Sequence, residues 1–170
     1  MSLEDIQAVI DSANARGIDH LEGFIRQKAP GMPEPQVKEA AEVALEIIES
    51  VPIFLARASQ EARNRQMVRT VQPMLDHAER YFLRPLDLIP EMTLGLAGLL
   101  DDTYLVLRIL QNLDRGPEPF LDWDLEFPLA FLRGLVGKEV GSKLDALSVA
   151  AMENFSQQLA LAWEQPSHEA

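Results

Sequence analysis

The run from Tyr81 to Val106 constrains the fold of this chain more than any other segment. A rigid Pro-x-Asp-Leu-Ile-Pro turn, from Pro85 to Pro90, precedes a hydrophobic stretch that ends in two adjacent carboxylates, Asp101 and Asp102. Burying a carboxylate costs desolvation free energy unless other groups compensate for it. The pattern therefore predicts a functional site or a structural lock, and it names no reaction.

Length and charge limit the class of protein. A chain of 170 residues, 47% hydrophobic and 25% charged, fits one globular domain. The formal net charge of −12, with no polybasic run, argues against a nucleic-acid partner and against stable adsorption on an anionic membrane. There is no cysteine, which excludes disulfides and thiol catalysis and is compatible with a reducing compartment. We therefore expect an acidic, cytoplasmic protein.

Apolar residues recur at helical spacing almost everywhere, and no segment shows the alternation of a strand. The chain is predicted to be all-α: a single helical bundle of six to eight helices with a central hydrophobic helix hairpin. The best candidate for a membrane span, Met92–Leu110, contains Asp101, Asp102 and Arg108. Charges at its centre are costly in lipid, so a buried core helix is predicted in place of a transmembrane span.

We expect one domain over residues 1–170. Its parts are an N-terminal helical pair at 1–30, a helix-turn-helix motif at 73–113 and a C-terminal helix at 142–164. Ser142 with Asp145 resembles a capping box that opens this last helix. Gly17 is expected to close the first helix, and Pro30-Gly31-Met32-Pro33 to break the chain before the long helix that follows. Pro52 is expected to kink or end that long helix, with Ser50 as the cap of a new helical pattern from Ile53.

Nine residues carry a resemblance to a known signature, in which a tyrosine precedes a Pro-x-Asp-Leu-Ile-Pro turn, a glycine and an Asp-Asp pair. They are Tyr81, Pro85, Asp87, Leu88, Ile89, Pro90, Gly98, Asp101 and Asp102. Over residues 73–110 the chain resembles the YkvA-like family, bacterial domain of unknown function 1232. Arg84 stands where that family usually has Ser, and Glu91 where it has Asp. The resemblance implies two hydrophobic helices joined by the turn, and no activity. Some eukaryotic members lie beside a membrane-bound RING ubiquitin ligase domain, which implies a membrane-proximal role.

The acids admit two interpretations. In the first, the motif is a structural lock: Asp87 caps a helix, and one of the paired acids accepts N–H groups of the turn or pairs with Arg84. The residues of this lock are Tyr81, Arg84, Pro85, Asp87, Pro90, Gly98, Asp101 and Asp102. Adjacent helical residues point about 100° apart, so the other acid is expected to be more exposed. In the second, an oxygen-rich site holds Mg²⁺ or Ca²⁺; its ligands would be Asp87, Glu91, Asp101, Asp102 and His77.

Other candidate surfaces are less specific. Gly95, Gly98 and Asp102 share one helix face, which suits tight helix packing or self-association into a homo-oligomer. The Met92–Leu100 run would allow peripheral membrane contact only if it were exposed. Asp122-Trp123-Asp124 is a weak candidate for a partner site.

No catalytic motif is recognisable: the chain has no Gly-rich phosphate loop and no H-E-x-x-H sequence. The first function hypothesis is therefore a non-enzymatic interaction or scaffold module with a protein partner and no cofactor, placed near a membrane through that partner. The alternative is a divalent-metal-dependent hydrolase or metal-binding regulator that uses Asp87, Glu91, Asp101 and Asp102.

Overall fold

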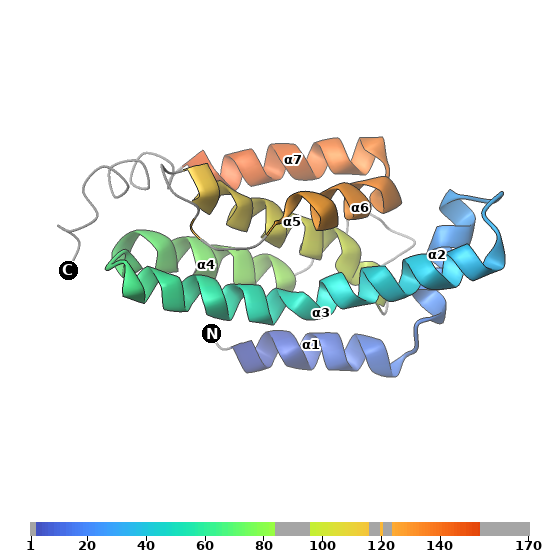
Figure 1. Ribbon diagram of the computed structural model, residues 1–170, viewed down its shortest axis with the longest axis horizontal. Helices are drawn as coiled ribbons and strands as arrows, with labels where there is room; N and C mark the ends of the chain where they lie inside the picture. The colour runs from blue at the N-terminus through green and yellow to red at the C-terminus, as the bar shows by residue number, and fades with distance from the viewer. Residues whose placement is uncertain (1–2, 84–95, 116–119, 121–123, 154–170) are drawn as a thin grey trace.

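The computed structural model describes residues 3–83, 96–115, 120 and 124–153, and these form an all-α bundle, as predicted (Figure 1). The described residues form seven α-helices and two short 3₁₀ helices. Their bounds are α1 Leu3–Ala15, α2 Asp19–Lys28, α3 Glu34–Asn64, α4 Val68–Leu83, η2 Leu96–Leu99, α5 Leu100–Gln111, η3 Asn112–Arg115, α6 Glu126–Val136 and α7 Lys138–Glu153.

The N-terminal helices α1 and α2 pack against the long helix α3. Gly17 joins them with a φ of +93°, a conformation that costs a glycine little and other residues more. The turn from α2 to α3 contains the expected Pro30–Pro33 breaker, and an ion pair of 2.6 Å between Arg26 Nη2 and Glu34 Oε1 crosses it. The predicted N-terminal helical pair thus lies on the bundle through its apolar faces.

Helix α3 continues through Pro52, which is buried. Of the two expectations for Pro52, the end of the helix is wrong, because burial of this turn in the core offsets the backbone hydrogen bond that the proline removes. Ser50 does not cap a new helix; its hydroxyl donates to the Ile47 carbonyl at 2.6 Å. The helix ends three turns later with Gln66 at a φ of 59°, where the Met67 N–H donates to the Ala62 carbonyl at 2.8 Å.

Helix α5 is the centre of the molecule. It contacts α3, α4, α6 and α7, and all of its residues from Leu100 to Leu107 are buried. In Figure 1 it runs between the α3–α4 side and the α6–α7 side of the bundle. The predicted helix from Met92 begins in the described residues with the 3₁₀ turn η2; residues 92–95 lie outside them. A helix that is apolar nearly all round needs this enclosure.

Helices α6 and α7 form a tight antiparallel pair whose connection is a single residue, Gly137 (Figure 1). Helix α7 begins at Lys138, one turn before the expected start at Ser142. The predicted Ser142–Asp145 capping box is therefore wrong, since both residues lie inside the helix. The part of the expected C-terminal helix beyond Glu153 lies outside the described residues.

Candidate functional site

The paired acids of the signature lie inside the bundle. Asp101 is 3% exposed and Asp102 is fully buried, both in the first turn of α5. The expectation that one of them is more exposed is wrong. Their side chains do point in different directions, but neighbouring elements cover α5 on every side, so no direction leads to solvent.

Two features of the chain offset the burial of these acids. The Asp101 Oδ1 accepts the backbone N–H of Asp102 at 2.9 Å. Both carboxylates also lie at the N-terminal end of α5, where the helix dipole favours negative charge. The acids therefore contribute to the start of the central helix, which is how a structural lock would use them.

Most other residues of the signature lie outside the described part of the chain. This holds for Arg84, Pro85, Asp87, Pro90 and Glu91. Tyr81 lies in α4, but its side chain is not among the described ones, and Gly98 is half-buried in η2. The lock and the four-acid metal site both stay predictions.

His77 lies half-buried on α4. Burial, and then the charge of Arg80, lower the pKa of His77 below its ordinary value, so the neutral imidazole is favoured. Within the described ranges, no three His, Asp or Glu side chains are grouped in a way that could hold a metal ion. The structure therefore does not bring His77 together with Asp101 and Asp102 as a metal site.

Glu79, one turn from Leu83 on α4, is a third buried acid, and the sequence did not single it out. It is 5% exposed, and its Oε2 has no hydrogen-bond partner among the described residues. Burial raises the pKa of Glu79, and the carboxylates of Asp76 and Asp5 raise it further. The protonated form is thus favoured in the folded chain relative to an exposed glutamate.

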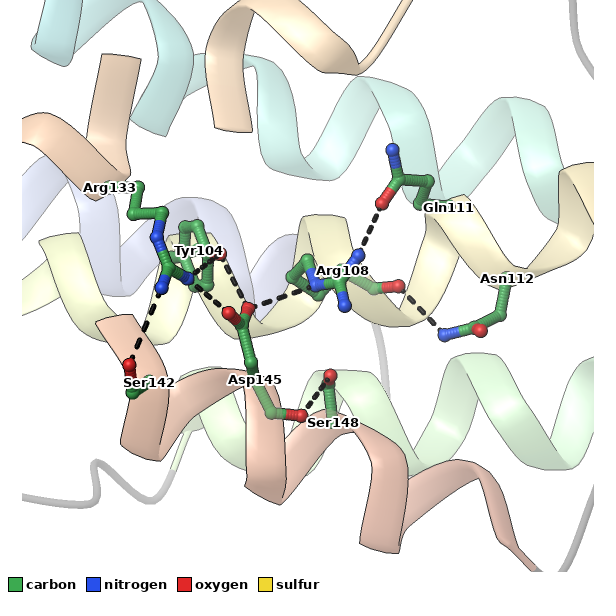
Figure 2. Close-up of polar contacts among 8 residues, drawn as sticks. All are labelled: Tyr104, Arg108, Gln111, Asn112, Arg133, Ser142, Asp145 and Ser148. Carbon is green, nitrogen blue, oxygen red and sulfur yellow. Dashed lines mark hydrogen bonds and ion pairs between the residues drawn. The ribbon is translucent and has the colours of Figure 1, made fainter. Parts of the chain in front are cut away.

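A polar cluster joins α5, α6 and α7. We call Tyr104, Arg108, Arg133 and Asp145 the Asp145 cluster (Figure 2). The Tyr104 hydroxyl donates to Asp145 Oδ1 at 2.6 Å, and Arg108 Nε lies 3.2 Å from the same oxygen. Arg133 Nη1 donates to Asp145 Oδ2 and, at 3.2 Å, to the Tyr104 hydroxyl. Donors from α5 and α6 therefore surround one carboxylate of α7.

The cluster shifts the ionisation of its members. Burial favours the neutral form of Asp145, but the hydrogen bonds from Tyr104 and Arg133 outweigh it and lower the pKa of Asp145. Burial and the hydrogen bond to Asp145 raise the pKa of Tyr104. The acid is held as an anion and the phenol as a neutral donor, so the arrangement is that of an inter-helical ion lock.

Neighbouring side chains hold the cluster in place. Arg108 Nη1 donates to Gln111 Oε1 at 2.6 Å, and the Ser148 hydroxyl donates to the Asp145 carbonyl at 2.8 Å. Gly141 of α7 is buried beside Arg133; a Cβ at this glycine would lie 3.0 Å from Arg133 Cγ. The missing side chain thus allows Arg133 to cross α7 and reach Asp145.

Helix α6 carries two apolar faces. Leu125, just before the helix, and Leu129, Leu132 and Val136 are buried. On the opposite side we define the outer face of α6 as Phe127, Ala130, Phe131 and Gly134, of which only Phe131 is half-buried. Phe127 is 62% exposed and its ring stacks on that of Phe131 at a centroid distance of 6.1 Å. Phe127 and Phe131, four residues apart, are the two large apolar side chains of this face, and Ala130 and Gly134 add little side-chain area to it.

Comparison with known proteins identifies one segment. Residues 80–107 match the model of a family described as a protein of unknown function, DUF1232. This confirms the resemblance seen in the sequence, over the last turn of α4, residues 84–95, η2 and the first two turns of α5. No curated protein and no solved structure matches the chain. None of the described helices has the length and apolar character needed to cross a membrane.

Proposed function

We propose that this protein is a non-enzymatic interaction module and that the outer face of α6 is its contact surface. The single observation that carries the proposal is the exposure of Phe127 beside Phe131 on a helix whose other face is already buried. A helix with apolar residues on both sides is normally enclosed. Here one side stays open to water, and a protein partner would cover it.

The buried acids support the same proposal. A hydrolase that used Asp101 and Asp102 on a substrate would need these carboxylates to be reachable, and they are 3% and 0% exposed. Their place at the start of α5 suits a structural role. The signature would then stabilise the bundle, and the surface elsewhere on the bundle would carry the function. We place this activity in the cytoplasm, near a membrane only through the partner.

A capture experiment with matched variants tests the contact surface. The chain, its Phe127→Ser variant and a Val149→Ser control would be immobilised and exposed to a lysate of the source cells. Val149 is a matched control, since it is 61% exposed, close to the 62% of Phe127, but lies on α7. We expect a partner that the wild-type chain and the control retain and that Phe127→Ser loses. Equal retention by all three would contradict the proposed surface.

A metal titration tests the alternative of a divalent-metal-dependent hydrolase or metal-binding regulator. Calorimetry with Mg²⁺, Ca²⁺, Mn²⁺ and Zn²⁺ on the wild-type chain and on Asp102→Asn should show no binding that depends on Asp102. Tight binding that Asp102→Asn removes would favour the metal site instead, because the buried acids would then be ligands.

A further inference from the structure

The connection between α6 and α7 is unusually short. Gly137 alone separates the two helices, with φ +92° and ψ 163°. Essentially only glycine adopts this combination. A Cβ built on Gly137 would meet no atom within 4 Å, so the backbone conformation is what restricts this position. The closed α6–α7 pair therefore depends on one residue with glycine's freedom.

Helix α7 is held mainly by contacts that another copy could supply unchanged. Its buried residues are largely small: Gly141, Leu144, Ser148, Ala151 and Met152. Its polar anchor is Asp145, which is bound by Tyr104 and Arg108 of α5 and by Arg133 of α6. Figure 2 shows these donors facing α7 from the opposite side of the interface. The docking surface is thus one continuous face formed by α5 and α6.

We infer that α7 is an exchangeable helix, and that two copies of this chain can swap it. If Gly137 became helical, α6 and α7 would join into one long helix, and α7 would dock on α5 of the second copy. Every contact of α7 with α5 would be re-formed in the swapped dimer. The α6 contacts would re-form between the copies where Arg133 of one chain meets Asp145 of the other.

The balance between the closed monomer and the swapped dimer should therefore be set at residue 137. A closed chain benefits from the high effective concentration of its own α7, which favours the monomer when the protein is dilute. Short connections under conformational restraint are the ones that favour exchange. Replacing Gly137 by a residue that prefers helical geometry should move the equilibrium toward the dimer.

Two alanine variants test whether residue 137 sets this balance. Gly137→Ala would be compared with Gly23→Ala, at an exposed helical glycine of α2 whose added Cβ also meets no atom within 4 Å. Sedimentation should show that Gly137→Ala dimerises at least about a hundredfold more tightly than the wild-type chain. The reason is that the backbone conformation of residue 137, unfavourable for alanine, is relieved in both chains of each dimer. Gly23→Ala should dimerise as the wild-type chain does. Equal dimerisation of both variants would overturn the inference.

A distance measurement distinguishes exchange from ordinary dimerisation, and it does not require Gly137→Ala to fold. Spin labels would replace Ala130 of α6 and Ala150 of α7, both exposed, in the wild-type chain and in Gly137→Ala. Each labelled chain would be refolded at about 1 mM in excess unlabelled chain, which favours exchange. In the dimer fraction the labels within one chain should be about 30 Å apart, the length of twenty helical residues. A dimer that keeps the short distance of the monomer, or no dimer at all, would refute the swap.

Discussion

Tyr104 of α5 donates its phenolic hydrogen to Asp145 of α7 over 2.6 Å, and this contact joins the central helix to the last described helix. The hydroxyl also accepts a hydrogen bond from Arg133 Nη1. One buried phenol therefore connects α5, α6 and α7. The relationship gives the bundle a fixed packing on this side of α5.

Removing the phenolic hydroxyl should weaken the bundle. Tyr104→Phe keeps the ring and deletes a hydrogen bond to a carboxylate, so we expect a loss of about 1.5–3 kcal/mol in the free energy of unfolding. Urea denaturation would measure it. The control is Gln7→Ala, which removes an exposed hydrogen bond to Asp11. A loss no larger than that of the control would show that the Tyr104–Asp145 contact adds nothing to stability.

The contribution of Asp145 should depend on pH. Its pKa is lowered in the folded chain, so the stability that it provides is present above the unfolded value near 3.9 and is lost as the pH falls through the folded value. Asp145→Asn should therefore cost about 1–2 kcal/mol at pH 7, allowing for partial exposure of the cluster. The two proteins should converge in stability near pH 2. A difference that stays constant from pH 7 to pH 2 would contradict the ionised lock.

Glu79→Gln should show the opposite dependence. The pKa of Glu79 is raised in the folded chain, chiefly by burial, so the folded state retains a proton that the unfolded state releases. The wild-type chain should lose stability as the pH rises from the unfolded value near 4.3 through the folded value. Glu79→Gln should be the more stable protein at pH 8, and this advantage should disappear at pH 3. Thermal melts of both proteins from pH 3 to pH 8 would measure this difference. A variant that is less stable than the wild-type chain at pH 8 would contradict the prediction, because it would mean that Glu79 is ionised and paired.

Asp101 and Asp102 should both matter for stability, because both are buried. Asp101→Asn and Asp102→Asn keep the shape of each side chain and remove a charged acceptor, which is worth about 1.5–3 kcal/mol. Asp11→Asn on the exposed face of α1 is the matched control. Melting temperatures would be compared for the three variants, and equal small shifts would contradict the structural role of the acids.

The sequence predicted the architecture well where it depended on local patterns. Helical spacing of apolar residues identified the bundle, and Gly17 and the Pro30–Pro33 breaker marked true boundaries. Pro52 misled the prediction, because a proline in a buried helical turn can be tolerated when neighbours enclose it. The Ser142–Asp145 pair misled it too: a capping pattern inside a helix cannot be told from one at its start without knowing where the chain turns.

The candidate site was only partly visible in the sequence. The sequence predicted that one of the paired acids is buried without saying which. The burial of both Asp101 and Asp102 depends on how many helices surround α5. The Asp145 cluster was missed because its members lie on three helices. One local signal existed: Tyr104 and Arg108 are four residues apart on one face of the helix. Their partner, Asp145, is set by tertiary packing that spacing does not encode.

Site-specific photo-cross-linking tests the proposed interaction surface most directly. A photoreactive phenylalanine analogue would replace Phe127 in cells that express the chain, and in a control it would replace Val149, which is exposed to a similar extent on α7. The account predicts a discrete cross-linked protein at position 127 and none at position 149. The same products at both positions, or no product at position 127, would contradict the role of the outer face of α6 as a contact surface.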